Sequence, residues 1–432
     1  RDADAGSLAG RPGSESIMGG EPRRKYLLAA IGPGMLVAAT GVGAGDLATA
    51  SIVGSKLGVA VLWAVVVGAF LKFVLNEGLA RWQLVTGETL IEGAVKRFGR
   101  TVSYLFLAYL LIWSVAVGRA LVSACGVTAH ALFPVFDDAT TGKIVFGVAH
   151  SLLGVALVWF GGYRLFERVM SVCIVLMFVT VVITAALLRP DIGAVLQGLA
   201  WPSIPRLDLG GLAWTVALLG GVGGTVTVLC YGYWIRQEGR ESVDDISLCR
   251  LDLATGYAAT AIFGIAMIIV GSTIEVEGGG AGLLVTLSTR LGESLGPVGR
   301  YVFLVGAWGA VASSLLGVWQ SVPYLFADLW RLLTAGSREH VPEVDTRRLP
   351  YRSFLVALGL VSIAGLFASF VQVQKVYALL GALFIPVLAL ALLILNGNKK
   401  WIGSRHANRP LTTVILVATL VLFLLFGYLQ IR

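Results

Sequence analysis

Residues 26–52 read YLLAAIGPGMLVAATGVGAGDLATASI, an apolar stretch long enough to cross a membrane. Glycine weakens a helix, and Gly41, Gly43 and Gly45 fall within five positions, so the pattern predicts a helix break deep in the bilayer. A single carboxylate, Asp46, follows the glycines. Because open backbone at this depth is tolerated only against protein or a water-filled cavity, and an intramembrane acid is costly, the stretch predicts a binding site. The alternative is that Asp46 caps a helix end or reaches interfacial water.

The composition is that of a polytopic membrane protein. Hydrophobic residues make up 57% of the 432-residue chain and charged residues 13%, and the mean hydropathy is +0.84. The net charge of +8 comes from Lys and Arg residues in short connections between apolar runs, where they set topology rather than bind nucleic acid. We therefore expect a protein of the plasma (inner) membrane, surrounded by the lipid bilayer and without an obligate protein partner.

The sequence contains no motif for catalysis or for a resident cofactor. The four cysteines, Cys125, Cys173, Cys230 and Cys249, are too widely spaced for a CxxC metal site or a disulfide framework. The four histidines form no zinc-type motif, and no phosphate loop or catalytic constellation is visible. We expect neither an enzyme nor a bound cofactor.

Eleven apolar segments are each long enough to cross a bilayer core of about 30 Å. They are residues 26–52, 58–83, 104–135, 144–161, 166–188, 210–235, 250–273, 299–330, 353–370, 374–396 and 410–430. Basic residues occupy alternate connections, beginning with Arg23, Arg24 and Lys25, and acidic residues occupy several of the others. By the positive-inside rule, this alternation predicts a cytoplasmic N-terminus and an external C-terminus.

A second glycine-rich interruption, LGGVGGTVT at 219–227, lies in the sixth apolar segment, five helices after the first. Interrupted segments at corresponding positions of two halves are typical of inverted-repeat transporters, whose site lies at the midplane between the breaks. Either glycine run could instead be a close-packing surface between intact helices. The predicted units are a disordered cytoplasmic tail at 1–25, a five-helix repeat at 26–188, an external connection at 189–209, a second, inverted repeat at 210–396, and a cytoplasmic loop with an eleventh helix at 397–432.

Other polar residues at membrane depth are weaker candidates for the site. A stripe in the second segment comprises Lys72, Asn76, Glu77 and Arg81. We interpret this stripe as running into the cytoplasmic interface, with a structural or gating role. Arg119 in the third segment has no acidic neighbour in the sequence, so its partner could be Asp46, a backbone carbonyl or water.

Further motifs follow one another along nearly the whole chain. They are GPGMLVAATGVGAGDLAT at 32–49, LVTGETLIEG at 84–93, GYRLFER at 162–168, LLRPD at 187–191, GLAWPSIP at 198–205 and FIPVLALALLILNGNKKWIG at 384–403. In this order they resemble the Nramp family of divalent-metal transporters. The resemblance implies an all-α polytopic membrane protein with a LeuT-type fold, which consists of two inverted five-helix repeats plus an eleventh transmembrane helix.

The metal-binding motifs of that family are altered in this chain. The family's first-helix signature Asp-Pro-Gly-Asn falls on residues 43–46, so its aspartate position is Gly43 and its asparagine position is Asp46. The sixth-helix signature Met-Pro-His-Asn falls on residues 227–230. Thr227 replaces the thioether, and Cys230 is left as a candidate soft ligand. The resemblance therefore carries the scaffold but not the selectivity.

The leading hypothesis is secondary transport of a divalent cation of the Mg²⁺ or Mn²⁺ class, because oxygen ligands suit hard ions. The candidate substrate-binding residues are Asp46, Gly43, Thr40, Gly45, Thr225, Thr227 and Cys230, of which Asp46, Thr227 and Cys230 are candidate metal ligands. The alternative is a small organic solute, with Trp234, Tyr231 and Tyr233 as an aromatic wall. A receptor or scaffold that has lost transport ranks last.

Proton coupling is expected to be weak or absent. The resemblance implies a relay through a carboxylate at the first break, a histidine on helix six, acids on helix three and an arginine on helix nine. Here Gly43 and Trp234 occupy the first two positions, the third segment offers Arg119, and the ninth has no charge. Arg119, Glu77 and Trp234 are assigned to a gating or polar network. A relay needs a chain of groups that change protonation, which Asp46 alone does not provide.

Overall fold

The first predicted span folds as three consecutive helical pieces. The computed structural model describes residues 32–207, 210–274, 283–334 and 344–431. In it, the span comprises α2 (Pro33–Gly41), a π-helical segment η1 (Val42–Thr49) and α3 (Ala50–Leu57). The wider π turns coincide with the glycine run and Asp46, so the helix is loosened at the expected place rather than fully interrupted.

The chain turns at Gly58 between the first and second spans. Gly58 has a φ of 66°, a conformation that glycine adopts without steric cost. It is the first residue of η2 (Gly58–Val61), which leads into α4 (Leu62–Thr86). Among the described residues, ten segments are long and apolar enough to cross a membrane, and the first, Asp46–Thr86, has 41 residues. At about 1.5 Å per residue it is roughly 60 Å long, enough for two crossings. This segment counts as two spans, so the ten segments agree with the eleven predicted spans.

Helices account for the rest of the regular structure in the described ranges. They are α5 (Leu90–Phe98), α6 (Arg100–Leu132), α7 (Ala139–Leu187), α8 (Ile192–Ala200), α9 (Gly211–Gly221), η4 (Val226–Cys230), α10 (Tyr231–Gln237), η5 (Val243–Asp245), α11 (Ile246–Gly271), α12 (Leu283–Thr334), α13 (Leu349–Ile363), η6 (Ala364–Phe367), α14 (Phe370–Leu395), α15 (Lys399–Ile402) and α16 (Pro410–Ile431). Helix α7 joins the predicted fourth and fifth spans, and α12 contains a non-helical residue, Gly296.

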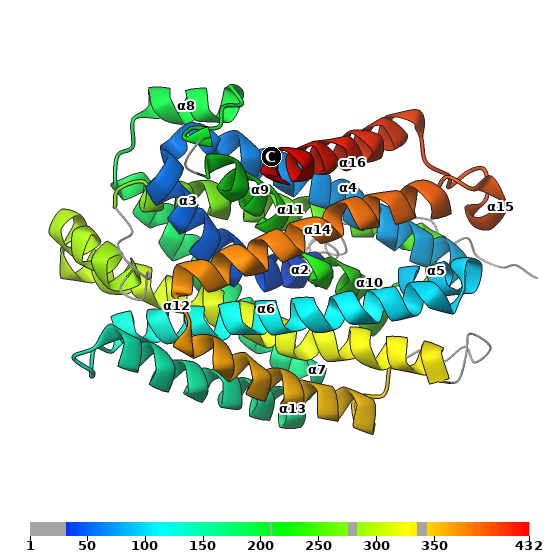
Figure 1. Ribbon diagram of the computed structural model, residues 1–432, viewed down its shortest axis with the longest axis horizontal. Coiled ribbons are helices and arrows are strands. Elements are labelled where there is room, and N and C mark those ends of the chain that lie inside the picture. Colours follow the sequence, from blue (N-terminus) through cyan, green and yellow to red (C-terminus); the bar gives the residue numbers. More distant parts are fainter. Residues whose placement is uncertain (1–31, 208–209, 275–282, 335–343, 432) are drawn as a thin grey trace, which may run out of the picture.

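The sixth span lies at the centre of the bundle. In the most apolar stretch of the span Gly211–Gln237, 94% of the residues are buried. The corresponding share is 17% for Ala139–Gly161 and 22% for Pro410–Leu429. Figure 1 accordingly shows α2 and α10 inside the bundle, with α13 and α16 along its outside. A break in the sixth span is therefore enclosed by protein, which is where open backbone is tolerated in a membrane.

The two ends of the bundle carry different short helices. Helices α5 and α15 lie at one end of the long axis and α8 lies toward the other (Figure 1). Helix α5 begins with a capping box, in which the Thr89 hydroxyl accepts from Glu92 N and the Glu92 carboxylate accepts from Thr89 N. We refer to this side of the molecule, where α4 and α10 also finish, as the α5 end.

Candidate functional site

The sixth span is interrupted where the sequence predicted its second break. Helix α9 ends at Gly221, Gly223 and Gly224 adopt φ angles of 69° and 89°, and the chain becomes helical again in η4. These positive φ angles require glycine, because an L side chain is strained there. The backbone carbonyls at the end of α9 therefore lack partners within their own helix and are available to other groups.

The two breaks touch each other through their backbones. A Cβ atom on Gly41, the last residue of α2, would overlap the backbone N of Gly224. The first break also contacts α12, because Gly43 N donates to Ser314 Oγ at 2.6 Å and that hydroxyl donates to Ala39 O at 2.6 Å. The predicted meeting of the two interruptions is thus direct.

Asp46 lies at this meeting point and is fully buried. Its Oδ2 accepts a hydrogen bond from Gly223 N at 3.3 Å, while its Oδ1 has no hydrogen-bond partner among the described residues. Gly264 of α11 packs closely beside this oxygen, since a Cβ there would lie 3.5 Å from Asp46 Oδ1 and 2.9 Å from Val65 Cγ1. A buried carboxylate with an unsatisfied oxygen is a group that gains strongly from a cation.

Lys72 of α4 supplies a positive charge on the other side of Gly223. Its side chain is 1% exposed, and Nζ donates to Gly220 O at 2.9 Å, to Val222 O at 3.0 Å and to Gly224 O. The ammonium therefore satisfies the carbonyls freed at the end of α9, where the helix dipole also favours a cation.

Asn76 and Tyr257 complete the polar cluster around the breaks. Asn76 Nδ2 donates to the Tyr257 hydroxyl at 2.9 Å, and the Tyr257 ring packs so closely on Gly223 that a Cβ there would lie 2.7 Å from Cε1. Both residues are buried. The interpretation of Lys72 and Asn76 as part of an interfacial stripe was wrong, because the Lys72 ammonium binds carbonyls of the sixth-span break and the buried Asn76 amide binds Tyr257 of α11.

The other candidate ligands occupy the same region but have their own contacts. Thr40 Oγ1 donates to Leu36 O at 2.6 Å, and Thr225 is buried against Gly381 of α14. Thr227 is buried in η4 beside Gly224, and Cys230 Sγ donates to Ser321 O of α12 at 3.5 Å. Gly45 lies within η1, and its surroundings fall outside the described part of the structure. The roles of these residues as ligands stay predictions.

The residues assigned to a polar network lie apart from Asp46. Glu77 pairs with Arg250 at 2.7 Å and with Arg81 at 3.4 Å, and Trp234 Nε1 donates to Gln320 Oε1 at 3.0 Å. Arg119 packs against Gly365 of η6, where a Cβ would overlap its side chain. Within the described residues, no ion pair joins Arg119 to Asp46, so the three partners predicted for Arg119 stay open.

Two residues of the proposed aromatic wall, Tyr231 and Tyr233, form hydrogen bonds with carboxylates at the α5 end. The Tyr231 hydroxyl donates to Asp252 Oδ2 at 3.1 Å, and the Tyr233 hydroxyl donates to Asp328 Oδ2 at 2.7 Å. Asp252 Oδ2 also accepts from Arg240 and from Gly34 N, both at 2.9 Å. The start of α2 is thereby tied to α11, a contact that the sequence pattern did not reveal because Asp252 lies 218 positions from Gly34.

The donor set limits which metals fit. In the described ranges, no group of three or more His, Cys, Asp or Glu side chains could hold a metal ion. The cluster around Asp46 instead offers one carboxylate, backbone carbonyls and hydroxyls. Such oxygen ligands suit hard, partly hydrated cations rather than zinc or copper.

The comparisons with known proteins agree with this architecture. The family model described as natural resistance-associated macrophage protein-like (Nramp) matches residues 34–432. A divalent metal cation transporter MntH of Yersinia pestis is 23% identical over 413 residues, which cover 93% of this chain and 94% of that protein. The MntH protein of Chromohalobacter salexigens is 24% identical over 276 residues, a match that spans 61% of each chain.

Solved structures of low sequence identity share the fold. A mutant of the Eremococcus coleocola manganese transporter superposes with a TM-score of 0.71 at 18% identity, covering 96% of this chain and 89% of that one. MhsT, solved in complex with L-phenylalanine, superposes with a TM-score of 0.61 at 15% identity, covering 95% of this chain and 98% of that one. The all-α membrane architecture and the LeuT-type fold are thus confirmed. Because the family model spans almost the whole chain, this protein belongs to the Nramp family.

Proposed function

We propose that the protein is a secondary transporter that carries a divalent metal cation, of the Mg²⁺ or Mn²⁺ class, through the site between the two breaks. The observation that carries this proposal is the fully buried Asp46, whose Oδ1 has no hydrogen-bond partner among the described residues. A buried intramembrane carboxylate with an unsatisfied oxygen is expensive unless a mobile cation uses it.

The site chemistry supports a hard cation that keeps some of its water. Asp46 supplies one charge, and the carbonyls at the end of α9 and the Thr225 hydroxyl supply neutral oxygens nearby. One carboxylate is few for a divalent ion, and Mg²⁺ commonly retains several waters when protein ligands are few. The predicted sulfur ligand, Cys230, would be needed only for a softer ion.

Relatives support the substrate class. The curated relatives named above are divalent metal cation transporters, and the Eremococcus protein is a manganese transporter. That this chain transports the same class of metal is a proposal, because its first-helix and sixth-helix motifs differ from those of the family. Of the aromatic residues of the organic-solute alternative, Tyr231 and Tyr233 bind Asp252 and Asp328, and Trp234 binds Gln320, so no hydrogen bond of these three within the described residues favours that alternative.

Little proton co-transport accompanies the metal in this proposal. His150 and Glu77 are the two groups through which an alternative relay could run, yet His150 Nδ1 lies 2.7 Å from Phe146 O and its Nε2 lies 2.9 Å from Trp308 Nε1. A ring that donates through Nδ1 and accepts through Nε2 is neutral and fully engaged. Glu77, the other alternative, is held between Arg81 and Arg250.

Uptake into proteoliposomes tests the proposed function. Purified protein is reconstituted with an internal metal-quenched dye and, separately, with an internal pH dye. We expect Mn²⁺ or Mg²⁺ uptake that follows the ion gradient and the membrane potential, with little internal acidification. Absence of uptake for every divalent ion would contradict the proposed function, and acidification beyond that of protein-free vesicles would contradict the coupling. Reporter fusions at the two ends would test the predicted cytoplasmic N-terminus and external C-terminus.

A further inference from the structure

The carbonyl oxygens at the second break are occupied by a cation that belongs to the protein itself. Lys72 Nζ bonds to Gly220 O, Val222 O and Gly224 O, three oxygens that converge on one point. Asp46 binds Gly223 N from the other side of the same short segment. The carboxylate and the ammonium therefore bracket Gly223, and both are withdrawn from water.

We propose that Lys72 is a tethered competitor of the transported cation, and that it sets the affinity and selectivity of the site. This inference rests on the proposed function and deepens it. The ammonium occupies oxygens that a metal ion leaving its water shell would use, and it offsets the charge of Asp46. A metal ion binds when the Lys72 side chain leaves these oxygens.

Electrostatics decide the direction of the effect. With Asp46 ionised and Lys72 protonated, the two side chains sum to zero charge, so an arriving ion gains little net attraction. Without the lysine charge, the same ion meets one uncompensated carboxylate. Because like charges repel strongly in an interior that excludes water, removal of the Lys72 ammonium should strengthen metal binding markedly.

A second buried lysine provides a matched control. Lys143 of α7 is 2% exposed, and its Nζ donates to the backbone carbonyl of Ala368 at 2.9 Å. Lys143 thus also caps a backbone carbonyl, but its partner lies just after η6 rather than at the sixth-span break. Lys143→Met removes a buried ammonium of the same kind without altering the site.

The test is calorimetric binding of Mn²⁺ and Mg²⁺ to purified wild-type protein, Lys72→Met and Lys143→Met. We expect Lys72→Met to lower the Kd for Mn²⁺ at least tenfold, and Lys143→Met to leave it unchanged. Should Lys72→Met fail to fold, Lys72→Gln keeps a hydrogen-bond donor for the carbonyls without the charge. Size-exclusion chromatography and thermal unfolding verify that each variant is folded.

The outcomes separate this inference from the proposed function. Equal affinity in wild type and in a folded Lys72 variant, or weaker binding in the variant, overturns the inference while metal transport stands. Binding in the Lys72 variant alone supports the competition and contradicts metal transport by the wild type. Binding by neither protein contradicts both.

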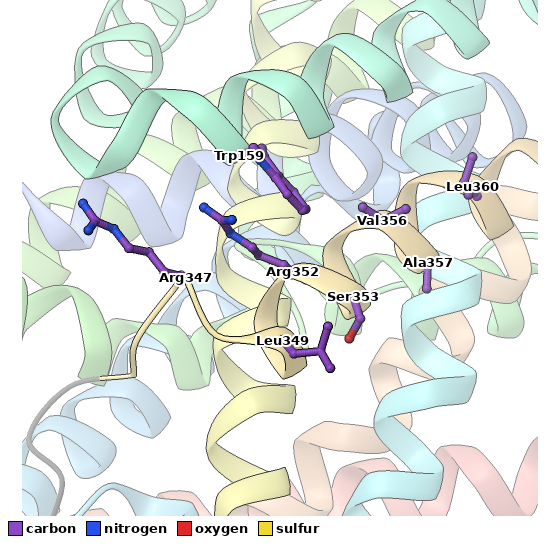
Figure 2. A pocket seen from close by; sticks show the side chains of 8 residues that line it. All are labelled: Trp159, Arg347, Leu349, Arg352, Ser353, Val356, Ala357 and Leu360. Carbon is purple, nitrogen blue, oxygen red and sulfur yellow. The ribbon is translucent and has the colours of Figure 1, made fainter.

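An independent observation concerns the outer surface. A cavity of about 690 Å³ lies where the first span of α7 finishes and α13 begins, as Figure 2 shows. The Arg352 guanidinium lies 4.4 Å from the ring centroid of Trp159, and Arg347 lines the cavity at its outer edge, with its side chain extending away from Trp159 (Figure 2). Val356 and Leu360 continue the cavity along α13 as an apolar surface.

We infer that this cavity binds the headgroup of an anionic phospholipid. In the described part of the chain, no ion pair involves Arg347 or Arg352, and the neighbouring Asp345 contacts Arg348 and the Arg347 backbone. Two arginines match a phosphate, Trp159 is suited to the level of the membrane interface, and the apolar surface suits an acyl chain.

Thermal unfolding in micelles that contain phosphatidylglycerol or phosphatidylcholine tests the lipid site. We expect phosphatidylglycerol to raise the Tm more than phosphatidylcholine, and the double variant Arg347→Gln and Arg352→Gln to lose more than half of that difference. Arg290→Gln, which removes an exposed arginine paired with Glu293, is the control. Equal effects of the two lipids, an unchanged double variant, or the same stabilisation by inorganic phosphate would overturn the assignment.

Discussion

The centre of the bundle and its α5 end hold their charges in opposite ways. At the α5 end, carboxylates face cations directly: Asp252 lies 2.9 Å from Arg240, and Arg331 lies 2.7 Å from Asp328. At the centre, Asp46 keeps an unpartnered oxygen, while Lys72 binds backbone carbonyls instead of a carboxylate. Paired charges hold elements together, whereas incompletely paired charges leave free energy for a ligand. The ion pairs of the α5 end therefore hold helices together, and the centre is where we propose that the substrate binds.

Removal of the central carboxylate should have the largest effect. We expect Asp46→Ala to reduce metal uptake at least 100-fold, because its removal leaves neutral ligands and the repelling Lys72. Folding should survive, because Lys72 keeps its three carbonyl partners and one backbone donor, Gly223 N, loses its acceptor, a cost of about 1–3 kcal/mol. Uptake in proteoliposomes measures the effect, and Glu77→Gln should be milder. If a folded Asp46→Ala protein took up metal as fast as the wild type, the two regions would not differ in the way described above.

The backbone contact between the breaks should be the next most sensitive feature. Gly41→Val places a side chain where the structure has Gly224 N, so the breaks must move apart. We expect uptake to fall at least tenfold and the Tm to fall as well, because overpacking of a filled interior commonly costs about 1–3 kcal/mol. Gly427→Val in α16 is the control, since nothing lies within 4 Å of a Cβ there. Equal behaviour of the two variants would show that the breaks tolerate separation.

The contacts of Asp252 at the α5 end should affect the conformation of the protein more than its affinity for metal. Asp252→Asn removes the charge that holds Arg240 and weakens the hold on Gly34 at the start of α2. We expect faster hydrogen exchange in the first turn of α2 and a lower Tm, with metal affinity within about threefold of wild type. Asp138→Asn, at an exposed helix cap, is the control for loss of an acidic group. A large loss of metal affinity would place Asp252 in the substrate site instead.

A smaller, pH-dependent effect is expected from the connection that leads to α5. Burial alone would raise the pKa of Glu88, but hydrogen bonds from Lys96 and Arg97 outweigh it and lower the pKa below 4.5. A lowered folded-state pKa adds stability above pH 4.5 that is lost as the pH falls through the folded pKa. Because the group is partly solvated, we expect Glu88→Gln to cost at most about 1 kcal/mol at pH 7, and less near pH 4. Thermal unfolding at both values checks this, and an equal cost at the two pH values would contradict it.

Much of the architecture was predictable from the sequence. Long apolar runs fixed the spans, and the glycines at 41–45 and 220–224 predicted both interruptions, because hydropathy and glycine act locally. The form of the first break was not predictable: η1 stays helical with π turns, since neighbouring helices support it. The boundaries of the two repeats stay predictions.

The site was only partly predictable. Asp46 was identified because it is the one acid beside the first break. Lys72 and Asn76 were assigned to an interfacial stripe, because sequence spacing relates them to Glu77 and Arg81 but does not show how α4 is rotated against the sixth span. The signal that could have identified Lys72 is its position in the run LWAVVVGAFLKFVL, well inside the second span. Asp252 could not be paired with Gly34, since that contact depends on tertiary packing.

The most direct test of the central claim is calorimetric titration of the purified protein and of Asp46→Asn with Mn²⁺, Mg²⁺ and Ca²⁺. Asparagine keeps the size of the side chain and an oxygen that can accept from Gly223 N, so the substitution removes the charge and replaces one carboxylate oxygen by an amide NH2. We expect at least one of the ions to give a binding heat in the wild type, and this heat to vanish in Asp46→Asn while thermal unfolding shows a folded variant. An undiminished binding heat in Asp46→Asn would contradict the assignment of the metal site to the two breaks.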